Sequence, residues 1–296
     1  MEFSTDLKAI IRCHQANDHF DRRAEITFNP TAPRFSAANA WWLAEISRWM
    51  YVGKRLPVTA RHRPQTILNA AGLEETHYLT RGGTHCSLIR SAGREFSILV
   101  FRGTCQLNNW VTNANIGPFK DNAHRGYEQA LDQVWDDVST ALAESPGQIF
   151  FTGHSMGGAL ATLAARRFQP AGVYSFGSPP IGNAALAAEF NQLPIYRMVN
   201  FKDAVCRIPF QQGHVGQLCY LSQDHSLLLD PDPEDIRADR AIGQRQINRE
   251  LNRNKKLAIP DFLCDHAPQN YIANLERLCL GYETELSNQE SDALMV

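Results

Sequence analysis

The chain has 296 residues, which is enough for one large domain with a sizeable core. Hydrophobic residues make up 44% and charged residues 20%, and 29 Lys and Arg against 31 Asp and Glu give a net charge of −2. This composition is ordinary for a globular protein. It shows no basic excess that would favour nucleic-acid binding, and no window is both apolar and long enough to cross a bilayer.

An apolar stripe at helical spacing predicts an amphipathic helix over 39–52 that docks on the core. The members of this stripe are Trp42, Ile46, Trp49 and Met50. The polar residues 1–38 before it predict a loosely packed N-terminal arm. We expect the helix to open a single domain of residues 39–285, followed by a C-terminal tail of residues 286–296.

Short apolar runs and helix-forming runs then alternate along the chain. The expected strands are 84–90, 96–102, 148–152, 172–176 and 195–201. The expected helices are 127–142, 158–168, 183–191 and 270–280. Strands that alternate with helices predict an α/β fold, in which a mainly parallel central sheet is covered by helices on both faces.

Residues 223–260 differ in character from the rest of this domain. Their first half is acidic, and their second half is basic and polar. The pattern is typical of a solvated, partly helical surface insertion, because charged faces usually only meet water. Partner binding by this insertion is the less favoured interpretation.

Cysteine usage and the N-terminus bear on the compartment. Seven cysteines, an odd number without a C-x-x-C pair, are typical of reduced and partly buried thiols, with one or two disulfides as the alternative. Residues 1–6 lack the basic region and following apolar stretch of a secretory signal. We therefore expect a cytoplasmic protein, and export without a cleaved signal is the alternative.

The sequence Gly-His-Ser-Met-Gly at residues 153–157 lies between a strand-forming run and an Ala- and Leu-rich helix-forming run. This order predicts a nucleophile elbow with Ser155 as the nucleophile. The glycines fit this interpretation, because side chains at 153 and 157 would crowd the neighbouring strand and helix. The simpler interpretation is a Gly- and Ser-rich turn that opens a helix, with Ser155 near its N-cap.

A serine hydroxyl needs a base to take its proton and an acid to orient that base. In α/β-hydrolases the acid and then the histidine follow the serine along the chain. Asp203 comes directly after the strand 195–201, at the end where catalytic groups collect, and is the expected acid. Asp224 and Asp230 are rivals, and an ordinary loop aspartate is an even alternative for Asp203.

Three histidines follow Asp203 and can serve as the base. His266 lies on a loop before the last helix, and we choose it. His214 and His225 compete with it equally when only chain order is considered. A lone histidine is more often structural than catalytic, so this choice depends on support from outside the chain order.

The oxyanion of an acyl-transfer intermediate needs backbone donors. One is expected from the N–H of Met156, directly after the nucleophile, and the other from Thr104, which follows the strand-like run 97–101. After Thr104 comes an Asn-rich segment with an apolar stripe at helical spacing, Leu107, Trp110, Val111 and Ala114. A mobile lid over the serine and an ordinary surface helix are equally good interpretations of this stripe.

Five blocks of the sequence, taken in order, are similar to those of one known family. They are 100–104 with Asn109 and Trp110, 124–127, 153–158, 175–183, and 200–205 followed by Ile208 and Pro209. Across residues 39–280 the chain resembles the class 3, fungal-type lipases of the α/β-hydrolases. The resemblance implies an α/β-hydrolase fold with Ser155 as nucleophile and Asp203 as acid.

The same resemblance implies that Thr104 and Met156 form the oxyanion hole. It favours His266 as base, because His266 lies in a D-H-x-x-x-Y setting like that of the family, whereas His214 resembles a structural H-x-G block. The insertion at 223–260, the Asn-rich lid and the lack of a visible signal depart from the family pattern.

The function expected from these residues is a serine carboxylester hydrolase of lipase type. It would cleave acyl esters of lipids (tri-, di- or monoacylglycerols) through an acyl-serine intermediate, and would contact a lipid surface transiently through the lid. The alternatives are a phospholipase A1 or thioesterase on the same triad, and a non-catalytic binding protein on a hydrolase scaffold. No metal or cofactor is expected, because the histidines and cysteines show no ligand spacing.

Overall fold

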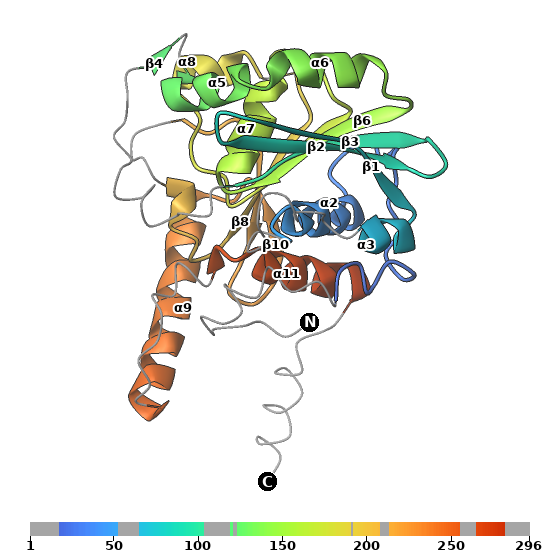
Figure 1. Cartoon of the computed structure of the whole chain (residues 1–296). Helices are drawn as coiled ribbons and strands as arrows, with labels where there is room; N and C mark the ends of the chain where they lie inside the picture. The colour runs from blue at the N-terminus through green and yellow to red at the C-terminus, as the bar shows by residue number, and fades with distance from the viewer. Residues whose placement is uncertain are drawn as a thin grey trace.

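The computed structural model describes residues 18–52, 65–103, 119–120, 123–190, 192–207, 213–254 and 265–281. In these residues one eight-stranded sheet runs through the centre, with strands in the order β1-β2-β3-β6-β7-β8-β9-β10 (Figure 1). From β3 to β9 neighbouring strands pair in parallel, and antiparallel pairs form the two edges. The mainly parallel sheet is as predicted. The strands are β1 Leu73–Arg81, β2 Thr84–Ser91, β3 Phe96–Phe101, β6 Gln148–His154, β7 Gly172–Phe176, β8 Ile195–Asn200, β9 Gln217–Leu221 and β10 Leu227–Leu229.

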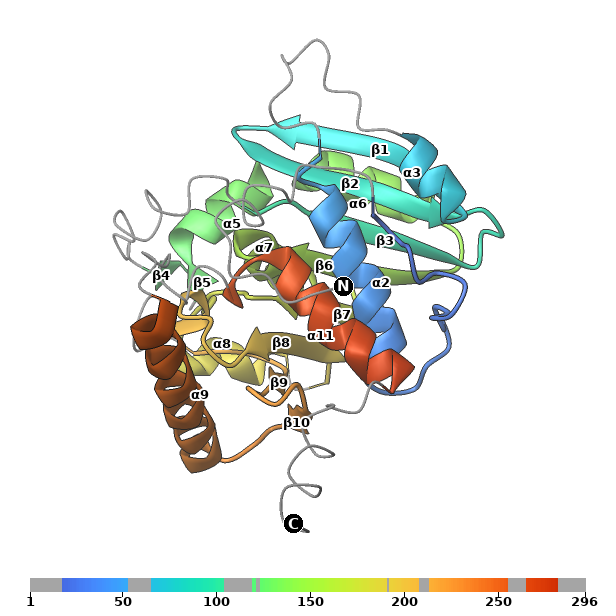
Figure 2. The same ribbon diagram turned by 90° about the horizontal axis from the view of Figure 1, so that it is seen from below.

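Helices cover both faces of this sheet (Figure 1). On one face, α2 (Ala37–Trp49) and α11 (Pro268–Leu280) lie side by side across the strands, and Figure 2 shows this face. The other face carries α5 (Arg125–Asp132), α6 (Trp135–Ala143), α7 (Met156–Ala164) and α8 (Ala184–Ala188). Shorter elements complete the described part: α3 (Gln65–Ala70), the two-stranded β4 (Phe119–Lys120) and β5 (Ala123–His124), and the 3-10 turn Val205–Arg207.

The alternation of side chains along each strand assigns them to these two faces. On β3, Ile98 and Val100 belong to the cluster that packs against α2 and α11, whereas Leu99 and Phe101 belong to the cluster under α5 to α7. On β6, Phe150 lies on the α2 side and Phe151 on the other. The same alternation places the last residue of β6, His154, on the face of α2 and α11.

Two predictions about the N-terminal region are wrong. Helix α2 is not amphipathic, because every residue from 39 to 49 is buried. The sheet covers one side of it and α11 and the preceding segment cover the other, so that even Arg48 is buried, paired with Glu45 at 2.9 Å. The described part of the expected loose arm, residues 18–36, packs into the same core through Phe20 and Ile26.

The other predicted elements are present, and the differences are a divided helix and unpredicted elements, among them β1, α3 and β9. The expected helix 127–142 is two helices, α5 and α6, separated at Gln133 and Val134. The edge strand β1 was not predicted, because its sequence LEETHYLTR is mostly polar and only its first residue is buried. The insertion at 223–260 contains β10 and the 22-residue helix α9 (Pro233–Asn254), which extends away from the sheet (Figure 2). The expected domain limits remain a prediction.

Candidate active site

The nucleophile elbow forms where β6 ends and α7 begins. Ser155 lies between them with φ 57° and ψ −132°, a conformation that costs a side-chain-bearing residue about 1–3 kcal/mol. Its N–H donates to the carbonyl of Phe176 at 2.8 Å, and its own carbonyl accepts from Gly158 at 2.9 Å. These bonds hold the strained turn and place Ser155 at the carboxyl end of a central strand.

Glycines make this turn possible. A Cβ at Gly153 would overlap the backbone of Gly157, and a Cβ at Gly157 would overlap the carbonyl of Phe101 on β3. The crowding predicted from the sequence is therefore confirmed. The turn joins three elements (β6, α7 and β3) so closely that no side chain fits at either glycine.

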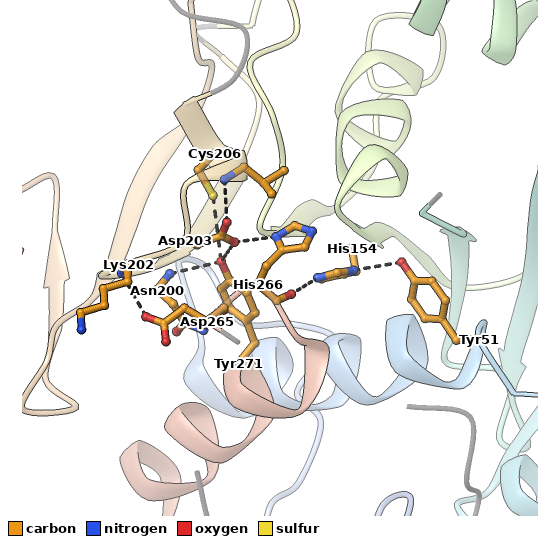
Figure 3. Close-up of polar contacts among 10 residues, drawn as sticks. Tyr51, His154, Asn200, Lys202, Asp203, Cys206, Asp265, His266 and Tyr271 are labelled. Carbon is orange, nitrogen blue, oxygen red and sulfur yellow. Dashed lines mark hydrogen bonds and ion pairs between the residues drawn. The ribbon is translucent and has the colours of Figure 1, made fainter. Parts of the chain in front are cut away.

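An acid–base pair lies beside the elbow (Figure 3). Asp203, just after β8, accepts a hydrogen bond from Nδ1 of His266 at 2.8 Å, and both side chains are buried. The Oδ2 atom of Asp203 also accepts the Tyr271 hydroxyl at 2.7 Å, and its Oδ1 atom accepts the N–H of Val205 at 2.9 Å. The sequence-predicted acid and base are thus in direct contact.

The electrostatics of this pair favour an ionised acid. Burial alone would raise the pKa of Asp203, but the His266 ring and the hydrogen bonds from His266 and Tyr271 hold that pKa below its usual value. An ionised Asp203 accepts a proton-bearing Nδ1, so that Nε2 of His266 carries the lone pair that a general base needs.

Ser155 lies close to this pair but is not bonded to it. The Nε2 atom of His266 is buried and has no hydrogen-bond partner in the described part of the chain. The ring centroids of His154, next to Ser155, and His266 are 4.5 Å apart. The N–H of Ser155 bonds Phe176, and a Cβ built on the next residue, Gly177, would lie 2.9 Å from the His266 ring. Hydrogen bonds between nucleophile and base are often long without substrate, so this arrangement is compatible with a working pair.

The rival histidines are committed elsewhere. Nε2 of His214 contacts the carbonyl of Cys206 at 2.6 Å, and Nδ1 of His225 contacts the side chain of Asn274 at 2.7 Å. Burial, helped by the nearby Arg197, lowers the pKa of His214 to about 3. Neither ring is bonded to Asp203, so the structure separates His266 from competitors that chain order left equal.

The rival aspartates have local roles. Asp224 accepts hydrogen bonds from the hydroxyl of Ser222 and from the N–H of Ser226. Asp230 accepts the N–H of Leu218 at 2.7 Å at the end of the β9–β10 pair. Both carboxylates therefore support turns and strand ends at the sheet edge, and Asp203 is the aspartate that meets a histidine.

The oxyanion residues are placed in part. Met156 is the first residue of α7, where backbone N–H groups have no partner within the helix. Thr104 and the lid candidates Leu107, Trp110, Val111 and Ala114 lie outside the described residues. The residue before Thr104, Gly103, is described, and a Cβ there would lie 3.1 Å from the Cβ of Ser155. The predicted oxyanion loop therefore starts beside the serine.

Two segments hold the turn that carries Asp203. Asp265 accepts the N–H of Lys202 at 3.0 Å through its side chain, and its carbonyl accepts the side-chain amide of Asn200 at 2.8 Å. From the other side, Arg240 of α9 donates to the carbonyl of Phe201 at 2.7 Å. Asp265, the residue before His266, and Arg240, in the first half of α9, thus both hold the turn that carries Asp203.

Sequence reasoning assigned no role to Tyr51, His154 and Tyr271; in Figure 3 Tyr271 lies against Asp203, His154 contacts His266, and Tyr51 lies on the far side of His154. Nε2 of His154 lies 2.6 Å from the carbonyl of His266, and the hydroxyl of Tyr51 lies 2.9 Å from Nδ1 of His154. The alternation along β6 was a usable signal, because it directs His154 to the face covered by α2 and α11. For Tyr271 the D-H-x-x-x-Y spacing was the available signal.

Within the ranges listed above, no three His, Cys, Asp or Glu side chains gather as a metal site, and Cys206, Cys219 and Cys279 form no disulfide. No helix in this part of the chain is both long and apolar enough to cross a membrane.

Comparison with known proteins shows which family the central part of the chain resembles. The family described as lipase (class 3) matches residues 98–213, which include the elbow and Asp203. Over these residues the chain is similar to the class 3 lipases. Among the relatives is a secreted mono- and diacylglycerol lipase of Fusarium solani, 28% identical over 175 residues, which are 53% of this chain and 53% of the relative.

A chloroplastic phospholipase A1 of Arabidopsis thaliana is 27% identical over 157 residues, which are 41% of this chain and 35% of the relative. The structure of the Rhizomucor miehei lipase propeptide complex superimposes with a TM-score of 0.57 at 19% identity, over 69% of this chain and 76% of that chain. This likeness confirms the predicted α/β-hydrolase fold. The chain spans about half the length or less of these curated sequence relatives.

Proposed function

We propose that this chain is a serine carboxylester hydrolase of the class 3 lipase family that cleaves acyl esters of lipids, with mono-, di- and triacylglycerols as the substrate class. Ser155 is the nucleophile, His266 the base and Asp203 the acid. The observation that carries the proposal is the strained elbow of Ser155 next to a buried, hydrogen-bonded His266–Asp203 pair. The mono- and diacylglycerol lipase among the relatives supports the substrate class.

In the proposed reaction, Nε2 of His266 takes the proton of the Ser155 hydroxyl as its oxygen attacks the acyl carbon. The N–H groups of Met156 and Thr104 bind the oxyanion of the tetrahedral intermediate, and each such donor contributes about 3 kcal/mol to the transition state. His266 then gives the proton to the leaving alcohol. Water attacks the acyl-serine with His266 again as base, which releases the fatty acid and regenerates Ser155.

A labelling experiment tests the nucleophile. Wild-type protein should react with a fluorophosphonate probe and hydrolyse p-nitrophenyl butyrate, and Ser155→Ala should lose both. The matched control is Ser97→Ala, because Ser97 is an equally buried serine that bonds the carbonyl of Pro146, on the other end of the sheet. Labelling that persists in Ser155→Ala rejects Ser155 as the nucleophile.

A phospholipase A1 is the second candidate, because a relative carries that name. A thioesterase on the same triad remains the other alternative for the reaction. Hydrolysis rates on monoolein, diolein, phosphatidylcholine and an acyl-thioester separate the three. A preference of more than about tenfold for phosphatidylcholine over the glycerides would replace the lipase assignment.

Two further parts of the proposal concern the surroundings of the enzyme. The segment with Leu107, Trp110, Val111 and Ala114 is proposed as a lid that contacts lipid surfaces, and activity that rises sharply above the solubility limit of tributyrin would support it. The prediction of a cytoplasmic location gains no support from the relatives, one of which is named as secreted. Assay of the culture medium and the cell lysate decides between the two compartments.

A further inference from the structure

A buried relay of three polar groups runs from the Tyr51 hydroxyl through the His154 ring to the main-chain carbonyl of His266 (Figure 3). The hydroxyl of Tyr51 contacts Nδ1 of His154 at 2.9 Å, and Nε2 of His154 contacts the main-chain carbonyl of His266 at 2.6 Å. The ring of Tyr51 meets that of His154 edge-on, with centroids 5.8 Å apart. None of these contacts takes part in the proposed proton transfers, yet His154 is covalently joined to Ser155.

The partners of His154 fix its protonation state. Burial and the neighbouring His266 ring lower the pKa of His154 to about 3, so the ring is neutral from pH 5 to pH 8. A neutral imidazole carries one N–H, and a carbonyl can only accept. The proton is therefore on Nε2, which donates to His266, and Nδ1 accepts the hydroxyl proton of Tyr51.

This tautomer connects the parts of the site that must keep a fixed spacing. His154 precedes Ser155 in the chain and binds the backbone of His266, so one side chain ties the nucleophile to the base. Tyr51 extends the tie to the oxyanion segment, because its hydroxyl and the Cβ of Ser155 both lie within 3.1 Å of the Cβ position of Gly103. A displacement of about 1 Å between reacting groups costs about a hundredfold in rate.

We propose that His154 and Tyr51 are positioning residues, which set the distance between Ser155 and His266 by holding the main-chain carbonyl of His266 through one tautomer of the His154 ring. The inference rests on the proposed hydrolase activity. His154, the histidine of the Gly-His-Ser-Met-Gly sequence, would thus position the triad without being part of it.

Three substitutions test the relay with p-nitrophenyl butyrate. His154→Leu removes the donor to the His266 carbonyl and should lower kcat by about a hundredfold, with KM changed by no more than about twofold. His154→Gln keeps an N–H near the position of Nε2 and should restore kcat to within about tenfold of wild type. Tyr51→Phe should lower kcat by about tenfold, because Nδ1 loses its donor and the ring is no longer held in one state.

A matched control separates positioning from loss of stability. Ser47 on α2 bonds the side chain of Thr152 on β6 at 3.2 Å, so it ties β6 to the helix that directly precedes Tyr51 but makes no hydrogen bond to a triad residue in the described part of the chain. Ser47→Ala should lower the melting temperature as much as Tyr51→Phe does, with wild-type kcat. Equal kcat in Tyr51→Phe and Ser47→Ala, a loss confined to KM, or equal kcat in the Leu and Gln variants of His154 would overturn the proposal.

A spectroscopic readout does not depend on the variants or on activity. In ¹⁵N-labelled wild-type protein, whose ring signals are assigned through bonds to their own backbone, the His154 ring should show a protonated Nε2 and a bare Nδ1 from pH 5 to pH 8. The opposite tautomer would overturn the relay even if all variants failed to fold. If wild-type protein shows this tautomer but does not react with fluorophosphonate, the hydrolase proposal fails and the geometry of the relay stands.

Discussion

The lack of room for a side chain at Gly177, next to Asp203 and His266, gives the sharpest test of the site. Gly177 has a φ of 60°, and a Cβ on it would lie 2.7 Å from Oδ2 of Asp203 and 2.9 Å from Cε1 and Nδ1 of His266. Gly177→Ala therefore adds a methyl group against the hydrogen bond that orients the base. Asp203 is held by Tyr271 and by the N–H of Val205, so we expect the His266 ring to yield.

The magnitude follows from two separate costs. A left-handed conformation costs alanine about 1 kcal/mol relative to glycine, which lowers stability. Contacts of 2.7–2.9 Å must lengthen by about half an ångström or more to reach ordinary van der Waals separation, and this displaces His266 from Asp203. Since about 1 Å of misplacement costs a hundredfold, we expect kcat to fall about tenfold to a hundredfold, or about 1.4–2.7 kcal/mol.

The assay compares kcat on p-nitrophenyl butyrate with the melting temperature in the same samples. Gly72→Ala is the control, because Gly72 has a φ of 71° and nothing lies within 4 Å of its Cβ position. It should show only the loss of stability that comes from the left-handed backbone, with unchanged kcat. If the two variants have equal kcat, the Asp203–His266 contact does not limit the reaction and the reasoning is refuted.

Three other perturbations have defined outcomes. Both His154 and His214 have a pKa of about 3 in the folded protein against about 6.5 when unfolded, so the unfolded state binds more protons as the pH falls below about 6.5. Stability should drop by about 1.4 kcal/mol per pH unit for each of them down to about pH 3, and urea titrations of His214→Gln should show a slope smaller by that amount. Asp203→Asn should lower kcat by about ten-thousandfold, whereas Tyr271→Phe, which leaves the carboxylate and its bond to His266, should cost about tenfold; equal losses in single-turnover assays would contradict the assigned roles. Gly157→Ala should not accumulate as folded protein, because its Cβ would overlap the carbonyl of Phe101; native-like circular dichroism of this variant would show that β3 can move away.

The parts of the site that the sequence predicted well are those fixed by local chemistry. The glycines at 153 and 157 carry a steric requirement that can be read from five residues, and Asp203 follows its strand directly. The parallel sheet also followed from local runs, because strands buried on both faces read as continuous apolar segments.

The remainder depended on contacts between segments far apart in the chain. His266 could not be separated from His214 and His225 by chain order, and the resemblance to a family favoured it before the structure showed its bond to Asp203. The apolar stripe in 39–52 suggested one buried face, but α11 and the residues before α2 cover the other side. Tyr51 acquires its place beside His154 only when α2 crosses β6.

The hydrogen bonds that hold the Asp203 turn bear on how much the length of the chain between Asp203 and His266 can change. Those two residues are 63 positions apart, yet two residues of the intervening stretch bind the turn that carries Asp203: Asp265, next to His266, and Arg240, within α9. With these two attachments in place, doubling the length of the chain between Arg240 and Asp265 costs only about 0.6 kcal/mol of closure entropy. We therefore expect a reporter or a further module inserted in α9 beyond Gly243 to leave the proposed hydrolysis unchanged.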